Sequence, residues 1–121
     1  MMPHDHDHLD AQEQAEIEAF EAEIRRLAQD QDRSDLCWLM SDKRGRRIMW
    51  RLLEQAGVFR TSFTTPNSMT VSFNEGRRTI GLSFLAEVHE HCPVRYNDMV
   101  KEHQEHAREL AKRRDQSRSV R

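Results

Sequence analysis

The sequence predicts an all-α protein, a small bundle of about four helices with an ordered loop at residues 58–71 and disordered termini. Two central stretches each begin with a basic turn that contains one glycine, at residues 44–47 and 75–78, and then continue with apolar residues at helical spacing. A loop rich in Thr, Ser and Asn joins them. The 121 residues are enough for one domain. With 36% hydrophobic and 33% charged residues, we expect a small core with long solvated arms.

The N-terminal region divides into two predicted parts. Residues 1–8 alternate His and Asp without helical periodicity, and we expect a disordered tail, with weak binding of a divalent metal as the alternative. Residues 9–33 predict an acidic amphipathic helix, over 9–29, and a turn or linker. The helix has one narrow apolar stripe with spacings of 3, 4 and 3, formed by Ile17, Phe20, Ile24 and Leu27. Such a helix is marginal in water alone, so it docks on the core or pairs with another chain.

Residues 34–114 predict the helical core domain. Ser34 is the expected N-cap of a short helical turn, and Ser41 or Asp42 caps the helix that follows. Gly57 is placed to end that helix in the left-handed conformation. The helix has a wide apolar face, made of Ile48, Met49, Leu52, Leu53 and Ala56. We expect four side chains to be buried, each contributing roughly 1.5–3 kcal/mol before entropy: Trp38, Met49, Leu52 and Leu53.

The loop at 58–71 lacks helical period, and a short β-hairpin around Pro66 and Asn67 is the alternative to an irregular ordered loop. Its expected buried anchors are Val58, Phe59, Phe63 and Val71. Ser72 or Asn74 caps the next helix, and Pro93 ends it. The apolar face of that helix consists of Ile80, Leu82, Phe84, Leu85 and Val88.

Gly76 and Gly81 lie inside the same helical pattern, where each costs about 1 kcal/mol relative to Ala. Close approach to another helix or another chain would explain them. A last helix is predicted from about residue 94 to 114, followed by a basic disordered tail at 115–121. One side of this helix carries Tyr96, Met99, Val100, His103, His106, Ala107 and Leu110.

Candidate chemistry is sparse. Cys37 and Cys92 lie in apolar surroundings and are expected to be buried thiols rather than a disulfide. A zinc site could use Cys92 with nearby histidines, but EHQEH is not HExxH, and packing or surface histidines are the preferred interpretation. No P-loop, G-x-S-x-G or G-x-G-x-x-G motif is present. We therefore expect no enzyme, no catalytic residue, no metal and no cofactor.

Charge is distributed unevenly. Residues 1–32 carry ten acidic and two basic side chains, whereas residues 108–121 carry six basic and two acidic ones. Opposite-sign ends favour intermolecular contacts or a folded-back chain. The basic clusters predict contact with anions or an acidic partner through Arg46, Arg47, Arg77, Arg78, Lys112, Arg113 and Arg114. Pairing with acids of the same fold is the more common arrangement, and the pI of about 6.4 argues against a dedicated DNA-binding protein.

Four motifs stand out between about residues 34 and 102: Gly45-Arg46-Arg47, Trp50-Arg51-Leu52-Leu53, Gly57–Phe63 (GVFRTSF) and Phe73–Arg78 (FNEGRR). With these motifs the stretch resembles a family of small proteins of tailed bacteriophages, typified by a protein of a short-tailed Bordetella phage. The resemblance implies a phage-encoded protein acting in virion structure, assembly or genome delivery, and it brings no catalytic residues.

These inferences predict a non-enzymatic virion or morphogenesis protein that works by protein–protein contact. The expected partners are portal, neck or tail components and further copies of the chain, with Ile17, Phe20, Ile24 and Leu27 as the contact residues. The alternative is a small protein that binds nucleic acid non-specifically beside DNA packaging. No apolar run approaches the ~20 residues of a membrane span, and no signal peptide is recognisable. We therefore expect the protein in the virion, and in the host cytoplasm during assembly.

Overall fold

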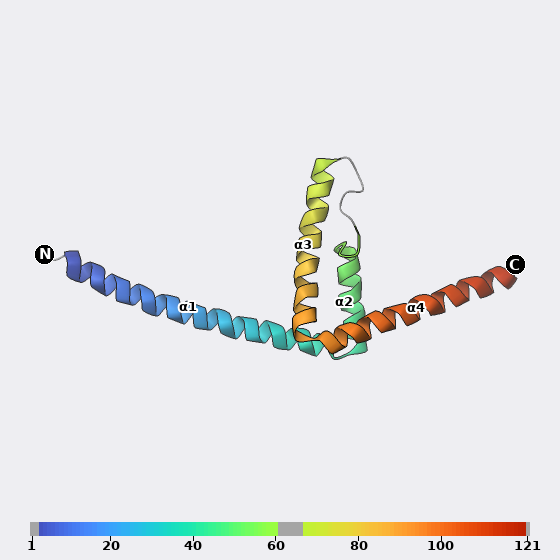
Figure 1. Ribbon diagram of the computed structural model, residues 1–121, viewed down its shortest axis with the longest axis horizontal. Helices are drawn as coiled ribbons and strands as arrows, with labels where there is room; N and C mark the ends of the chain where they lie inside the picture. Colours follow the sequence, from blue (N-terminus) through green and yellow to red (C-terminus); the bar gives the residue numbers. More distant parts are fainter. Residues whose placement is uncertain (1–2, 61–66, 121) are drawn as a thin grey trace. The chain divides into compact units, whose positions relative to one another are not determined.

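The computed structural model describes the backbone of residues 3–60 and 67–120 and the side chains of residues 10–60 and 67–119. Its described residues form four helices and no strand: α1 (Pro3–Met40), α2 (Lys43–Gln55), α3 (Ser68–His91) and α4 (Pro93–Val120). Figure 1 shows these elements along the chain. The predicted all-α class is confirmed. The chain divides into two units, Met1–Asp35 and Leu36–Arg121, and each is described by itself.

The first unit is the N-terminal part of α1. The helix begins at Pro3 and continues without interruption through residues 30–34, where the sequence predicted a turn or linker. That prediction was wrong, as was Ser34 as an N-cap. The polar stretch is compatible with a helix because local side-chain pairs support it. Arg26 bonds Asp30 at 3.0 Å, and Gln31 bonds Asp35 at 2.8 Å, both at the i, i+4 spacing that brings side chains together on a helix.

In the second unit, α2 begins as the sequence predicted. Asp42 is its N-cap, and the Asp42 carboxylate accepts a 2.7 Å hydrogen bond from the Arg44 N–H. Gly57, with φ of 77°, follows the helix and takes the left-handed conformation that an L side chain disfavours. The Val58 N–H then bonds the Leu53 carbonyl at 3.2 Å, which directs Val58 back into the core.

Helix α3 begins earlier than predicted. Its N-cap is Asn67, whose side chain accepts hydrogen bonds from the N–H groups of Met69 and Thr70, and not Ser72 or Asn74. An Asx cap with two bonds makes the first turn helical even though its residues have no clear apolar period. Phe63 and the hairpin considered around Pro66 fall outside the described residues; Asn67 itself is the cap.

Pro93 separates α3 from α4, as predicted, and starts α4 in the first-turn position where its missing N–H costs nothing. Helix α4 continues to Val120, so residues 115–120, predicted as a disordered tail, are helical. Every described side chain from residue 104 to 119 is exposed. The second half of α4 is therefore a solvated helix rather than part of the core.

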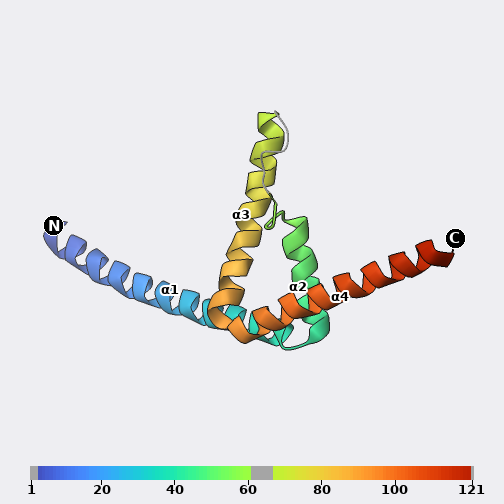
Figure 2. The ribbon, with the colours of Figure 1, turned by 45° about the vertical axis from the view of Figure 1, so that its right-hand side comes forward.

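The core of the second unit is formed by the end of α1, by α2, by the residues directly after it, and by α3 and α4. In Figures 1 and 2, α2 and α3 lie side by side and antiparallel, and the first half of α4 crosses them near the end of α3. The buried apolar residues are Leu36, Met40, Met49, Leu53, Val58, Val88, Cys92 and Met99. Burial of Met49 and Leu53 agrees with the sequence prediction.

Several expected core residues are exposed instead. Trp38 is 75% exposed and Leu52 is 41% exposed, so both predictions of burial were wrong. Phe59, at 48%, is also on the surface, and Val71 is half-buried. For Leu52 and for the apolar face of α3, the reason is that α2 and α3 each contact neighbours along one narrow strip, which leaves part of each apolar face outside the core. On α3 the uncovered residues are Ile80, Leu82 and Phe84.

Close packing of α3 against the end of α2 explains why a glycine stands at position 81. A Cβ at this position would lie 2.6 Å from both the Ala56 Cβ and the Val58 Cγ2, so only glycine allows α3 to approach the end of α2 this closely. A Cβ added to Gly76 would meet no atom within 4 Å. The close approach expected from the sequence therefore holds within this chain for Gly81 and not for Gly76.

Candidate functional site

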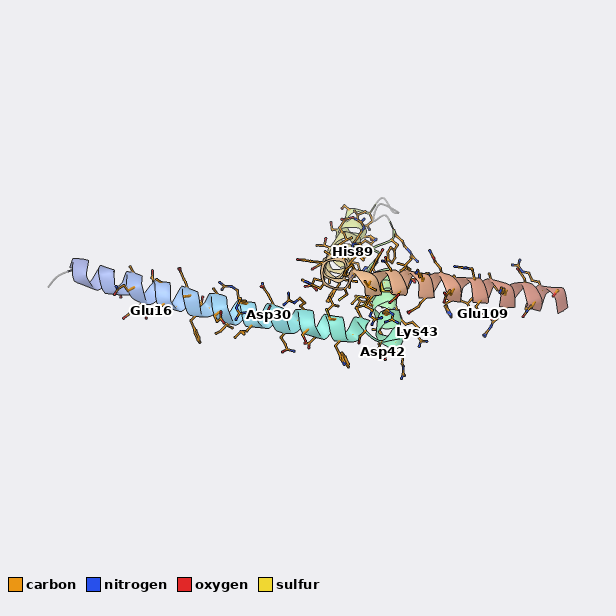
Figure 3. The ribbon with its side chains drawn as sticks, turned by 60° about the horizontal axis from the view of Figure 1, so that its bottom comes forward. Glu16, Asp30, Asp42, Lys43, His89 and Glu109 are labelled. Carbon is orange, nitrogen blue, oxygen red and sulfur yellow. The ribbon has the colours of Figure 1, made fainter. Side chains whose placement is uncertain are left out.

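A groove of about 740 Å³ lies between α2 and residues 99–109 of α4. Four basic side chains of α2 line it, Lys43, Arg46, Arg47 and Arg51. Acidic side chains of α4 line it too, among them Glu105 and Glu109. Figure 3 labels Lys43 at the start of α2 and Glu109 on α4. The groove thus has charges of both signs, which fits a polar surface of another protein better than a uniformly charged polymer.

Aromatic side chains stack beside this groove. The Trp50 ring stacks on His103 of α4, with ring centroids 4.1 Å apart and planes inclined by 23°. Phe59 stacks on Trp50 at 4.9 Å. The Trp50 indole N–H donates to the Glu54 carboxylate. This stack joins α2, the segment after it and α4, so the aromatic and histidine residues here have a packing role.

Arg46 is buried and occupied within its own chain. Its guanidinium donates to both oxygens of Glu102, with Nη2 2.7 Å from Oε1 and Nε 3.1 Å from Oε2, and its Nη1 donates to the Met40 carbonyl at 2.9 Å. The Glu102 carboxylate raises the pKa of Arg46 above its usual value. Arg46 therefore pairs with an acid of its own fold. This pairing was the alternative, from the sequence, to contact with an external anion or an acidic partner.

The other predicted basic residues are more accessible. Arg47 is exposed on α2, and the α4 cluster of Lys112, Arg113 and Arg114 is exposed too. Arg77 donates to the Gln55 carbonyl at 3.2 Å and lies 5.3 Å from the centre of the Phe73 ring. Arg78 is half-buried, and its Nε makes no hydrogen bond within the described residues. These residues do not converge on one site: Arg46 and Arg47 belong to α2, Arg77 and Arg78 to α3, and the cluster to α4.

The predicted contact stripe lies in the first unit. Its four side chains, Ile17, Phe20, Ile24 and Leu27, are between 49% and 66% exposed. Figure 3 shows the α1 side chains projecting on all sides of the helix, with Glu16 labelled next to the stripe in sequence. A helix segment that exposes four large apolar side chains in a row has a surface suited to a partner.

Sequence reasoning did not identify the pairing of the two cysteines. Cys37 is half-buried, Cys92 is buried, and their sulfur atoms lie 3.2 Å apart as free thiols that share a hydrogen bond. Burial, together with this hydrogen bond, raises the pKa of Cys92 to about 11. The histidines near Cys92 do not join it: among residues 10–60 and 67–119, no three His, Cys, Asp or Glu side chains are grouped closely enough to hold a metal ion.

Comparison with protein families gives a match that follows the packed part of the chain. The model of the Bbp19-like phage proteins matches residues 36–101, which begins where the second unit begins and ends near the last core residue of α4. The chain belongs to the Bbp19-like phage protein family. The resemblance drawn from the sequence motifs is thereby confirmed. The family region of this Bbp19-like protein includes α2, α3 and the groove-lining residues up to Met99, and excludes the α1 stripe and the basic end of α4.

Searches among curated proteins and among solved structures each gave no significant match to this Bbp19-like protein. Within the part of the chain that the structure describes, no helix is both long and apolar enough to cross a membrane.

Proposed function

We propose that this Bbp19-like protein is a non-enzymatic component of the phage virion or of its morphogenesis, and that it acts through protein–protein contact in particle structure, assembly or genome delivery. Family membership supports a phage role. The exposed α1 stripe is the observation that supports action by protein–protein contact. Covering four large apolar side chains with a partner removes them from water and so lowers the free energy of the complex.

The proposed partners are portal, neck or tail components of the particle and further copies of the chain. The family region supplies a small folded core, and α1 and the second half of α4 present long exposed helix surfaces of opposite charge. Such surfaces steer association and restrict it to partners of complementary charge. The protein would act in the virion, after assembling from the host cytoplasm.

Quantitative mass spectrometry of purified mature particles and of assembly intermediates tests this proposal. We expect the protein in at least one of them at a fixed ratio to the portal. A phage carrying Ile17→Ser, Phe20→Ser and Ile24→Ser should lose that incorporation, whereas Ala19→Ser with Ala22→Ser, on the opposite side of α1, should retain it. Absence from both particles and intermediates would contradict a structural or assembly role.

A second candidate is non-specific nucleic-acid binding beside the packaging machinery. The exposed basic end of α4 favours it, with Arg108, Lys112, Arg113, Arg114 and Arg118 all at the surface. Duplex affinity should then fall steeply with salt, and replacing Lys112, Arg113 and Arg114 by Gln should reduce the log–log slope by about one per lost phosphate contact. Affinity that does not change between low and moderate salt would exclude this candidate.

A further inference from the structure

The outer side of the α2–α3 pair exposes a second apolar surface. We call it the α2–α3 face; its apolar residues are Ile48 and Leu52 of α2 and Phe73, Ile80 and Phe84 of α3, all of them exposed. The register of the two helices brings these side chains together. Gly81 lies against Ala56, and the helices run antiparallel. Leu52, one turn before Ala56, and Phe84, about one turn after Gly81, are therefore at the same level of the pair.

Three arginines lie along the α2 side of this face. Arg44 and Arg51 lie on α2 at the helical spacing that flanks Ile48, and Arg77 of α3 reaches α2 through its bond to the Gln55 carbonyl. Within the described residues none of the three guanidinium groups pairs with a carboxylate. An occupant that combines an apolar strip with negative charge therefore matches the apolar residues and the arginines together.

The stripe on α1 has that combination. At helical spacing, Glu16 lies on one side of the stripe and Glu21 on the other. Neither carboxylate pairs with a base in the described part of the chain, whereas Glu23 is held by Arg26 at 2.6 Å. The lengths agree as well: Ile17 to Leu27 spans roughly 15 Å, and Phe73 to Phe84 on α3 spans roughly 17 Å.

We propose that α1 of one copy docks on the α2–α3 face of a second copy, with Glu16 and Glu21 facing the arginines that border it. The inference rests on the proposed contact function of the α1 stripe and names its occupant. Every copy carries both the acidic apolar strip and the basic apolar face, so either a reciprocal dimer or a chain of copies satisfies all of them. The interface belongs to an oligomer of this protein.

Photo-crosslinking between labelled copies tests the contact directly. The full chain, with benzoylphenylalanine in place of Phe20, is mixed as equal parts of nitrogen-15-labelled and unlabelled protein and irradiated. We expect peptides that join labelled to unlabelled chain, with the partner peptide from residues 44–52 or 73–84. Crosslinks only within one isotopic species, which would mean docking in the same chain, or crosslinks to other peptides, would overturn the proposal.

Charge exchange gives an independent measurement by size-exclusion light scattering and sedimentation. Glu16→Lys with Glu21→Lys should raise the dissociation constant of the oligomer at least about tenfold, and so should Arg44→Glu with Arg51→Glu. All four substitutions in one chain should restore association. Glu18→Lys, on the far side of α1, is the matched control and should leave it unchanged. All these variants lie at exposed positions, so circular dichroism should report an unchanged fold.

The two proposals can fail separately. A chain that is monomeric at all concentrations, or whose association is indifferent to these charges, overturns the docking of α1 on a second copy. If that chain is still incorporated into particles at a fixed ratio, the proposed role in the virion or its assembly stands. If the copies associate as proposed but the protein is absent from particles and from assembly intermediates, the docking of α1 on a second copy stands and the proposed role in the virion or its assembly is overturned.

Discussion

Arg46 and Glu102 form the one ion pair between different helices in the described part of the chain, with Nη2 and Oε1 2.7 Å apart and side chains only 9% and 19% exposed. The bond joins α2 to α4. The third interaction of Arg46, with the carbonyl of Met40, ties the end of α1 to the same point. One guanidinium therefore connects three helices of the core unit.

Removing one partner of this pair should destabilise the core strongly. Arg46→Met leaves the Glu102 carboxylate without its partner, and Glu102→Gln leaves a buried guanidinium without its acid. We expect a loss of about 3 kcal/mol in the free energy of unfolding for either change. Urea unfolding followed by tryptophan fluorescence measures it. Arg46→Met combined with Glu102→Leu should recover most of the loss; a double variant as unstable as the sum of both would contradict an interaction between the two.

The two glycines of α3 should respond in opposite directions to alanine. At Gly81 the added Cβ meets Ala56 and Val58 at 2.6 Å, so overpacking outweighs the gain in helix propensity, and we expect a net loss of about 1–2 kcal/mol. At Gly76 the space is open, and we expect a gain of up to about 1 kcal/mol. Thermal unfolding of both variants checks this. Equal effects at both positions would show that α3 does not approach α2 as described.

The two tryptophans provide a matched pair. Trp50 stacks on Phe59 and His103, whereas Trp38 is mostly exposed. Trp50→Ala should cost about 3 kcal/mol of unfolding free energy, and Trp38→Ala should change it by no more than about 0.5 kcal/mol. Denaturant unfolding, followed by far-ultraviolet circular dichroism, measures the unfolding free energy of both variants. A costly Trp38→Ala in a monomeric sample would mean that Trp38 contacts the core.

The Cys92 thiol predicts a loss of stability at alkaline pH. Its pKa is raised from an ordinary value of 9.0 to about 11 in the folded protein, so the folded state holds the proton more tightly. Its contribution is fully present below about pH 9 and is lost as pH rises toward about 11. We expect a decline on the order of 2 kcal/mol from this group.

Urea unfolding in a reducing buffer across this pH range measures that decline. Cys92→Ala is the control, because it removes the thiol while other alkaline titrations remain. The slope of stability against pH should be shallower in the variant. Parallel slopes for the two proteins would contradict a raised pKa at Cys92.

The sequence was sufficient for the features that depend on neighbours along the chain. Asp42 as a cap, Gly57 as a left-handed stop, Pro93 between two helices and the periodic burial of Met49 and Leu53 all follow from local geometry. The motifs around Gly45 and Phe73 also placed the chain among phage proteins. The polar stretch at 30–34 misled the prediction, because i, i+4 side-chain pairs maintain a helix there that composition alone does not indicate.

The tertiary structure decided which of several chemically similar residues are buried in the core and which remain on the surface. Arg46 and Arg47 are adjacent in sequence and alike in chemistry, yet Arg46 is buried against Glu102 and Arg47 is exposed. Leu52 and Leu53 differ in the same way, since only Leu53 points into the core. The sequence by itself determined the all-α class, the Asp42 cap of α2 and the family. Which side of each helix is buried depends on contacts between residues far apart in the chain, such as Gly81 with Ala56. Only the packed structure shows those contacts.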